Sequence, residues 1–313
     1  MLKFAVRRVL STIPVMALVA FLVFSLLYFA PGDPALLFAG DSATPQQIEE
    51  VRRNLGLDQS FWVRFGSWLW AVLHGELGVS MISNVPVATL IRQRIEPTLS
   101  LMALTLVWAV TAAVPLALIS AWKQGTAIDR GIMGFGVFGF SVPIFVLAYC
   151  LSYVFAVELR WFPIQGYVPI SRGVGPWLNS LALPAFALGT SYVALISRIG
   201  RAALIEILQQ DYIRTARAKG AAPKEILFDH ALKNAAVPIV TVIGIGVGLL
   251  IGGAVVTESV FALPGIGRLT ADAILRRDYP VIQGVVLLFS FTYMLVNLAV
   301  DLIYPLFDPR IRY

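Results

Sequence analysis

The amino-acid sequence predicts an all-α membrane protein with six transmembrane helices. Two observations predict this class. Of the 313 residues, 58% are hydrophobic and only 13% are charged, whereas soluble domains carry roughly 25% charged residues. Six apolar stretches also approach or exceed the roughly 20 residues that a helix needs to cross the hydrocarbon core. The predicted spans are residues 9–30, 98–122, 132–157, 181–197, 236–257 and 281–304, of which the fourth is short and is expected to extend into its cytoplasmic flank.

The first span is preceded by Lys3, Arg7 and Arg8, as the core of a secretory signal peptide would be. The apolar run is about 22 residues long, however, which exceeds the 7–15 residues of a signal-peptide core. The candidate cleavage point after Ala30 runs directly into Pro31. We therefore expect a retained first span.

Basic residues predict the orientation. With the N-terminus placed inside, all five lysines fall in inner segments, whereas the acidic residues lie mostly outside. Cytoplasmic loops of membrane proteins are enriched in Lys and Arg. Both termini are therefore expected in the cytoplasm. The net charge of +6 is explained by these loops, so no nucleic-acid partner is expected.

The long outer segment between the first two spans is expected to be folded. Thr44-Pro45-Gln46-Gln47 has the pattern of a helix N-cap, a proline in the first turn and a capping-box glutamine. This helix should end near Leu55-Gly56. A second helix, either lying on the membrane surface or packing on neighbouring spans, is indicated by apolar residues at helical spacing: Phe61, Trp62, Phe65, Trp68, Leu69 and Leu73.

No catalytic or metal site is expected. The two histidines, His74 and His230, fall on opposite sides of the membrane in this topology and cannot act together. The chain also lacks a Walker A phosphate-binding loop, so it should not hydrolyse ATP by itself. The single cysteine, Cys150, lies in an apolar run and is expected to be a small core residue.

The inner segment 198–235 is basic and patterned. Gly220 is placed to end one helix with a left-handed cap, and Pro223 suits the first turn of a second helix. Glu225 would lie in the positive first turn of that second helix and Lys233 in its negative last turn. The pattern predicts a helix-turn-helix.

Three interpretations of this segment are open: a solvated inner loop, a helix pair lying on anionic lipid, and a docking element for a cytoplasmic partner. The segment is long for a connection within a bundle. Its apolar residues Ile226, Leu227 and Phe228 would also need a cover. These features favour the docking element.

Several residues within the spans are candidates for a translocation path or gate. Pro143 should bend the third span next to Ser141, as a static kink or as a gate. Gly248 and Gly252 form a small-xxx-small pair, which is typical of close helix packing; lining of the path or a subunit interface is the alternative. Glu258 is a further candidate for the path or gate, with a role at an interface as the alternative. Glu258 and Asp301 are the ionisable residues near the membrane and are too few to suggest an ion-coupled carrier.

One segment of the chain is similar to a known motif. Residues 211–238, DYIRTARAKGAAPKEILFDHALKNAAVP, resemble the cytoplasmic motif of binding-protein-dependent ABC importer permeases, in the form of the dipeptide/oligopeptide/nickel branch. The family pattern is Glu-Ala-Ala, three residues and Gly, and the aligned residues here are Arg214, Thr215, Ala216 and Gly220. Only the second Ala and the Gly are retained, and the Leu-Pro element is displaced to Val237-Pro238.

The resemblance extends along the whole chain. It includes PGDP at 31–34, GELGVSMISNVPVATLIRQRIEPTLSL at 75–101, SVPIFVLAYCLSYVFAVELRWFPIQGY at 141–167, TESVFALPGIGRLTADAILRRDYPVIQG at 257–284 and NLAVDLIYPLFDPRIRY at 297–313. The order of these segments matches that of the family.

The resemblance implies a type I ABC importer permease fold. It divides the chain into an N-terminal span and external loop region (1–97), a permease core (98–304, with the coupling loop at 198–235) and a cytoplasmic tail (305–313). The implied location is the bacterial inner membrane. The implied partners are a second homologous permease forming a heterodimer, two ATP-binding subunits and an external solute-binding protein. ATP and Mg²⁺ would be used by the ATPases, with no cofactor bound by this chain.

The resemblance also assigns residue roles in the loop that couples to the ATPases. Ala216 and Gly220 would permit close approach, Arg214, Arg217 and Lys219 would contact the ATPase or lipid, and Lys224 and Glu225 would start the second helix. The implied solutes are di- or oligopeptides, with nickel complexes, glutathione or opines as alternatives. A passive channel is the contrasting class.

Overall fold

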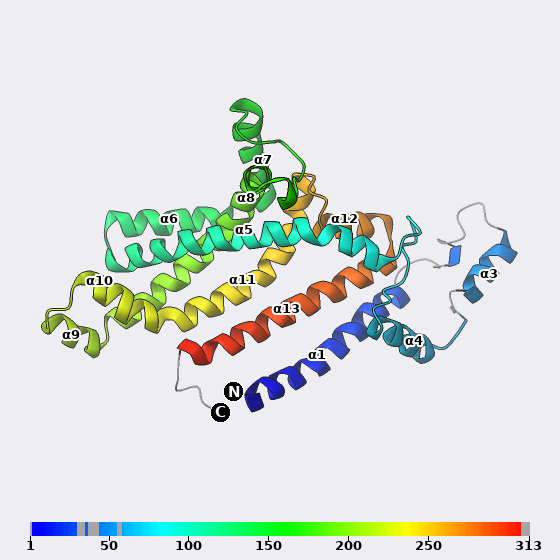
Figure 1. Ribbon diagram of the computed structural model, residues 1–313, viewed down its shortest axis with the longest axis horizontal. Helices are drawn as coiled ribbons and strands as arrows, with labels where there is room; N and C mark the ends of the chain where they lie inside the picture. The colour runs from blue at the N-terminus through cyan, green and yellow to red at the C-terminus, as the bar shows by residue number, and fades with distance from the viewer. Residues whose placement is uncertain (1, 30–34, 37–43, 55–57, 308–313) are drawn as a thin grey trace. The chain divides into compact units, whose positions relative to one another are not determined.

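The computed structural model of the chain describes residues 2–29, 35–36, 44–54 and 58–307 (Figure 1). The PGDP segment, the expected helix end at Leu55-Gly56 and the last residues of the tail lie outside this range. The described residues are helical, and their only β-pairing is an isolated antiparallel bridge between Val79 and Pro86. The all-α prediction is therefore confirmed.

Five helices are long and apolar enough to cross a membrane, and a bent helix pair brings the number to six if the pair is counted as one span. The spanning segments are Val9–Leu26 within α1 (Leu2–Phe29), α5 (Val87–Trp122), the pair α6 (Ala127–Ser141) and α7 (Ile144–Leu151) with the π-helical turn η1 (Ser152–Glu158), α8 (Val174–Leu208), Pro223–Val260, and Tyr279–Leu302 within α13 (Tyr279–Phe307).

Two of the helices extend well beyond the apolar stretches from which they were predicted. α5 begins at Val87 rather than at residue 98, and α8 covers Val174–Leu208 rather than 181–197. Charged residues in the added turns of both helices, such as Arg94 and Arg201, keep those turns out of a hydropathy-based span. Hydropathy marks the segment that fits in lipid, whereas turn residues and caps set where a helix ends.

The chain divides into two compact units, which we describe separately. The larger unit contains Met1–Val6, Arg94–Leu269 and Tyr293–Tyr313, and the smaller one contains Arg7–Gln93 and Thr270–Thr292. The boundaries between the units fall inside α1, α5, α12 (Ile266–Arg276) and α13.

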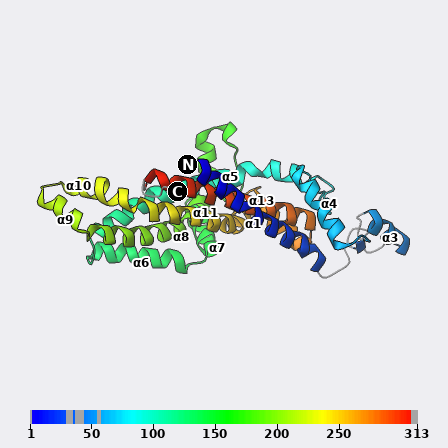
Figure 2. The same cartoon turned by 90° about the horizontal axis from the view of Figure 1, so that it is seen from below.

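Helix α8 is the centre of the larger unit. In its apolar window 78% of the residues are buried, compared with 28% for α5. α8 lies between α6 and α11 (Lys233–Val260) in both views (Figures 1 and 2). Small residues permit these close contacts: an added Cβ at Gly200 would lie 3.1 Å from the Ala117 Cβ on α5. A helix buried on all sides is predicted to be apolar around its whole circumference, as α8 is over most of its length.

The smaller unit contains α3 (Pro45–Asn54) and α4 (Phe61–Leu73). α3 begins with the predicted capping box, because the Thr44 N–H donates to Gln47 Oε1 at 2.8 Å and the Gln47 N–H donates to Thr44 Oγ1 at 3.4 Å. The turn before α5 is fixed by Asp278, whose carboxylate accepts from Ser80 Oγ at 2.5 Å and from the Met81 N–H at 3.1 Å.

The predicted aromatic helix is α4 (Phe61–Leu73). One face packs on α1, with the rings of Phe61 and Phe65 each 5.4 Å from the ring of Phe24. Packing on a neighbouring span is therefore confirmed for that face. Trp62 is 69% exposed although its ring stacks on Phe21 of α1 at 6.1 Å, and Trp70 is 67% exposed. Exposed tryptophans on such a helix are typical of a membrane surface.

The prediction for Cys150 is wrong. Its side chain is exposed on α7 rather than packed in the core. An apolar run marks a membrane-facing residue as readily as a core residue, because lipid and protein interior are both apolar. Hydropathy alone cannot separate the two.

Candidate functional site

The predicted inner turn is built by a Schellman motif at the end of α9 (Asp211–Ala218). The Ala221 N–H donates to the Ala216 carbonyl at 3.1 Å, and the Gly220 N–H donates to the Arg217 carbonyl at 3.0 Å. These two bonds close the end of the helix and reverse the chain. Gly220 itself has φ +87, so the left-handed cap predicted there is confirmed.

Gly220 is required by its backbone conformation rather than by lack of space. No atom lies within 4 Å of a Cβ added at this position. Any other L-residue would nevertheless have to adopt the left-handed region, which costs roughly 1–2 kcal/mol. Ala216, four residues earlier, is half-buried. Gly220 is therefore required for the backbone of this turn, whereas Ala216 is a small residue in a partly covered position.

The second helix begins as predicted but does not end as predicted. Pro223 starts α10 (Pro223–Glu225), and Glu225 Oε2 accepts from the Ala222 N–H at 3.4 Å. The helix continues through the π-helical turn η3 (Ile226–Leu232) into α11, so Pro223–Val260 is one continuous helix. Lys233 therefore lies inside a helix, paired with Asp229 at 3.0 Å, and not in a last turn.

The continuous helix changes the extent of the helix-turn-helix. Residues 198–208 belong to α8 and residues 223–235 belong to the helix that contains α11, so only 209–222 protrude as α9 and its turns. α9 and α10 lie together at one end of the larger unit in both views (Figures 1 and 2). The protruding segment 209–222 therefore begins where one long helix, α8, ends, and it ends where a second long helix, Pro223–Val260, begins. A π-turn such as η3 is a frequent marker of functional sites in helices.

The candidate coupling residues of this segment are mostly exposed. Arg214, Thr215, Arg217, Lys219, Lys224 and Glu225 are all accessible to solvent. Arg214 forms an exposed pair with Asp211 at 3.1 Å. Arg217 lies over the Trp122 ring at 5.8 Å from its centroid, so its guanidinium also holds α9 against the end of α5. The surface is basic, with side chains available to a partner.

The apolar residues of the segment are divided between the core and the surface. Ile213 and Ile226 are buried, and Leu227 packs on a core cluster formed by α5, α8, η3 and α11. The chain itself therefore covers Ile226 and Leu227. The expectation that a partner is needed to cover these two residues is wrong. Phe228 remains 52% exposed, so the expectation that a partner covers it stays a prediction, and Tyr212, which is 44% exposed, was missed in the sequence.

A cavity of about 470 Å³ lies at the base of α9. It is lined by Ala121, Trp122, Gln124, Ile205, Leu208, Gln209 and Arg217. Tyr212, on the same helix, does not line this cavity; partial burial raises the pKa of its hydroxyl above the ordinary value. The base of α9 thus offers hydrogen-bond donors and one cation.

The third span is broken rather than bent. α6 ends at Ser141, α7 starts at Ile144, and the two helices differ in direction by 102°. Pro143 has no N–H to donate to the Gly139 carbonyl. The Ser191 hydroxyl of α8 donates to that carbonyl at 2.8 Å instead. A membrane helix can break only where such replacement donors exist, and Ser191 could not have been identified from the sequence.

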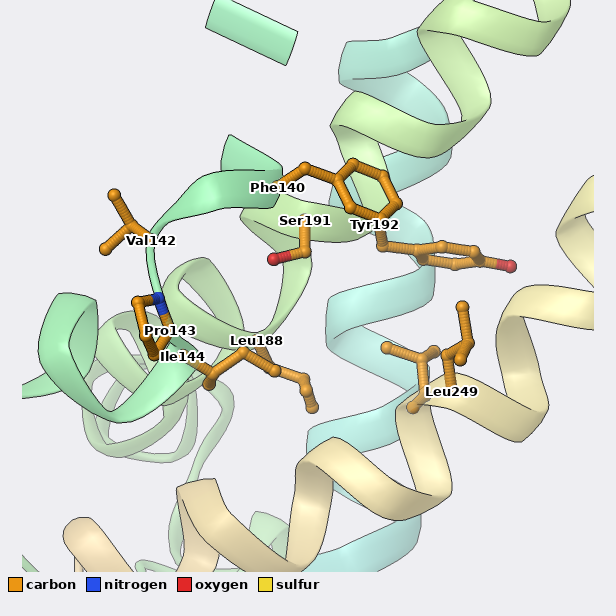
Figure 3. Close-up of a pocket in the computed structure, with 9 residues that line it drawn as sticks. Phe140, Val142, Pro143, Ile144, Leu188, Ser191, Tyr192 and Leu249 are labelled. Carbon is orange, nitrogen blue, oxygen red and sulfur yellow. The ribbon is translucent and has the colours of Figure 1, made fainter. Parts of the chain in front are cut away.

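A cavity of about 290 Å³ lies beside this break. Its lining is almost wholly apolar and comes from the α6–α7 break, α8 and α11 (Figure 3). Pro143 lines it, whereas Ser141 is exposed and bonds back to the Val137 carbonyl at 2.8 Å. Of the predicted path residues, only Pro143 contributes to this cavity.

The two glycines of the predicted packing pair differ. An added Cβ at Gly248 would lie 2.6 Å from the Tyr293 ring, so close helix packing is confirmed there. Gly252 has no atom within 4 Å of an added Cβ and is exposed. The prediction of close packing within this chain is therefore wrong for Gly252, and the alternatives of a subunit interface or a path lining stay open for it.

Glu258 is fully buried and forms a hydrogen-bonded cap. Its carboxylate accepts from Thr98 Oγ1 at 2.6 Å and from the Arg268 N–H at 3.0 Å, and Thr98 Oγ1 accepts from the Ile266 N–H at 2.8 Å. The first turn of α12 is thereby tied to α11 and α5. These hydrogen bonds give Glu258 an anchoring role.

No group of three His, Cys, Asp or Glu side chains that could hold a metal ion occurs in the described part of the chain. The site is instead an exposed basic helix, α9, with its turn. It is carried by the end of α8 (residues 198–208), which we call the stem. Such a surface can bind another macromolecule.

Comparison with known proteins identifies the family. Residues 113–313 match the family described as "Binding-protein-dependent transport system inner membrane component", and residues 1–102 match its N-terminal companion. The chain belongs to this family of multi-pass inner-membrane transport proteins, as the sequence motifs predicted.

Individual relatives extend the match over the full length. The chain is 51% identical over 310 residues to the "Probable peptide ABC transporter permease protein y4tP" of Sinorhizobium fredii, covering 99% of both chains. It is 42% identical over 313 residues to the "Glutathione transport system permease protein GsiC" of Escherichia coli K12, covering 100% of both. The resemblance to the peptide branch is confirmed.

A solved structure supports the fold. The inward-facing MetNI methionine ABC transporter has a chain that matches 70% of this chain and 96% of its own length, with a TM-score of 0.59 and 18% identity. The predicted type I importer permease fold is therefore confirmed.

Proposed function

We propose that this chain is the transmembrane permease subunit of an ATP-driven importer of di- or oligopeptides. The observation that carries the proposal is the full-length match to a peptide ABC transporter permease at 51% identity. The exposed basic turn around Gly220 on a buried stem supports it, because such a turn suits docking to a second protein.

The partners follow from the class of transporter. A second, homologous permease forms a heterodimer with this chain, and the two chains enclose the translocation path. Two cytoplasmic ATP-binding subunits bind ATP and Mg²⁺ and seat α9 and its turn. An external solute-binding protein selects the peptide. This chain contributes no catalytic residue, because its sequence lacks a phosphate-binding loop.

Glutathione is the second candidate solute, since the 42% identical relative is a glutathione permease and glutathione is itself a small peptide. Nickel complexes and opines are further alternatives within the same class. A passive channel is the contrasting function.

Reconstitution tests the proposal. Proteoliposomes containing this chain, its permease partner, the ATPases and the binding protein should accumulate a labelled dipeptide only when MgATP is on the ATPase side. Competition with unlabelled glutathione should be weak. Uptake that proceeds without nucleotide would contradict the proposal and favour a channel, and strong competition by glutathione would identify glutathione as the solute.

The proposed topology places the N-terminus and α9 in the cytoplasm. Ser60 and Ala222 are both exposed and lie on opposite sides in this topology. In a Cys150→Ser background, which removes the exposed native thiol, an impermeant maleimide should label Ser60→Cys from outside and Ala222→Cys only from inside. Reversed labelling would contradict the orientation.

A further inference from the structure

An ion pair between buried Asp129 and partly buried Arg201 lies at the base of the coupling segment. The Arg201 guanidinium binds the Asp129 carboxylate through two bonds, from Nε to Oδ1 at 2.7 Å and from Nη2 to Oδ2 at 2.7 Å. Asp129 is only 3% exposed. Ser120 Oγ also donates to Oδ1 at 2.5 Å, and the Gly125 N–H donates to Oδ2 at 2.9 Å. Both oxygens of the carboxylate are therefore fully engaged.

The bonds connect three helices, α5, α6 and α8, and the short connection between α5 and α6. Ser120 lies near the end of α5, Gly125 lies in the short connection, and Asp129 lies in the first turn of α6. Arg201 lies on α8, 72 residues away in sequence. α8 ends at Leu208 and α9 begins at Asp211, so the pair joins the α5–α6 hairpin to the stem that carries the coupling helix.

Other sides of the stem are held by different forces. Leu204 of α8 is buried against Ala117 and Ala121 of α5 and against Ala235 and Ile239 of α11. Such apolar contacts are non-directional, so they permit one helix to slide or rotate on another. A bidentate arginine–carboxylate pair has a fixed geometry. Here the ion pair supplies a directional contact between α8 and the α5–α6 connection.

A buried ion pair is weak evidence for stability, because an apolar pair of similar volume is often neutral or better. Its distinct property is geometric. We propose that Asp129 and Arg201 are positioning residues: they fix α8 to the α5–α6 hairpin so that a displacement of α9 moves both elements together. This inference rests on the proposed function as a coupled importer.

The test separates positioning from folding. Three variants of the complete transporter are compared in proteoliposomes: Arg201→Lys, Asp129→Asn and the apolar double variant Asp129→Leu/Arg201→Met. The double variant removes both charges at once, so no unpaired buried charge impairs folding. Arg198→Met is the matched control, because Arg198 is an exposed arginine on the same helix. Basal ATP hydrolysis, solute-stimulated hydrolysis and peptide transported per ATP are measured together.

All variants that assemble should retain basal hydrolysis. The double variant should lose roughly 2- to 30-fold in peptide transported per ATP, the range known for mutations that alter coupling between sites. Arg201→Lys keeps the charge but not the two parallel bonds, so it should lie between the double variant and the wild type. Arg198→Met should behave as wild type.

Wild-type peptide transport per ATP in the double variant would overturn the inference and leave the pair a purely structural contact. A wild-type complex that shows no ATP-dependent uptake would contradict the proposed function instead. The two failures are therefore distinguishable.

Discussion

Gly220→Arg is expected to abolish solute-stimulated ATP hydrolysis in the reconstituted transporter while membrane insertion of the chain stays intact. Gly220 has φ +87, and an arginine there costs roughly 1–2 kcal/mol in the left-handed region. This free-energy cost is too small to unfold the chain or prevent its insertion, but it falls entirely on the backbone of the turn. The chain would relieve it by distorting the Schellman motif, and a guanidinium would project from the docking surface. Hydrolysis with and without loaded binding protein measures the loss.

Two further variants make this prediction specific. Gly220→Asn keeps a small side chain that tolerates the left-handed region, so it should retain most of the stimulation. Ala216→Asp should behave like Gly220→Arg, because Ala216 is half-buried and its carbonyl accepts the Ala221 N–H at 3.1 Å. Wild-type stimulation in Gly220→Arg would refute the assignment of this turn to ATPase docking.

The turn at Gly220 was predictable because its determinants are local. A glycine at a helix end and a proline three residues later specify a reversal without help from distant residues. The end of the second helix was not predictable in the same way. No local stop signal marks the point where η3 continues into α11. A lysine is favourable both in the last turn of a helix and in an i,i+4 pair inside one, and Lys233 forms such a pair with Asp229.

The missed parts of the site depend on contacts between distant residues. In the sequence, Asp129 and Arg201 are single charged residues next to predicted spans, with nothing to indicate that they pair. They are 72 residues apart, and only the folded structure brings them together. The same holds for Ser191, which replaces a donor that Pro143 lacks. The proline predicts that a carbonyl needs a new partner, but the sequence does not say which hydroxyl supplies it.

The sequence also could not predict which apolar residues of this segment the chain itself buries. Ile226, Leu227 and Phe228 are adjacent and equally apolar, yet Ile226 is 2% and Phe228 52% exposed. Which of them faces inward depends on the rotation of η3, and that rotation is set by packing on α5 and α8. Pattern alone predicts an apolar side, and the fold decides which residue a partner can reach.

Glu258→Ala is expected to release the first turn of α12 from the larger unit. The substitution leaves Thr98 Oγ1 without its carboxylate acceptor at 2.6 Å and the Arg268 N–H without its acceptor at 3.0 Å. A polar group that loses its partner costs about 1–3 kcal/mol; Thr98 Oγ1 keeps the Arg94 carbonyl at 3.5 Å as a weak alternative, so the combined loss is about 3 kcal/mol. Amide hydrogen exchange at Ile266 and Arg268 in the purified chain should accelerate by roughly 100-fold, at about 1.4 kcal/mol per factor of ten.

Ser259→Ala is the matched control, because Ser259 is the next residue on α11 but is exposed and bonds only to the Val255 carbonyl in its own helix. It should leave the exchange of both amides unchanged. Glu258→Gln keeps a carbonyl oxygen as acceptor and should fall between the two. Unchanged exchange in Glu258→Ala would show that Thr98 alone holds the turn.

Gly265 and Gly267 permit a second, independent test of the hydrogen bonds around Glu258. A Cβ at Gly267 would lie 2.7 Å from Val255 Cα and 2.9 Å from Glu258 Oε2, and one at Gly265 would overlap the same carboxylate. Gly267→Ala must therefore push the turn away from α11, since backbone cannot yield as a flexible side chain does. Gly252→Ala adds the same methyl group where no atom lies within 4 Å. If the cap at Glu258 anchors α12, Gly267→Ala should accelerate exchange at Arg268 as Glu258→Ala does, and Gly252→Ala should not.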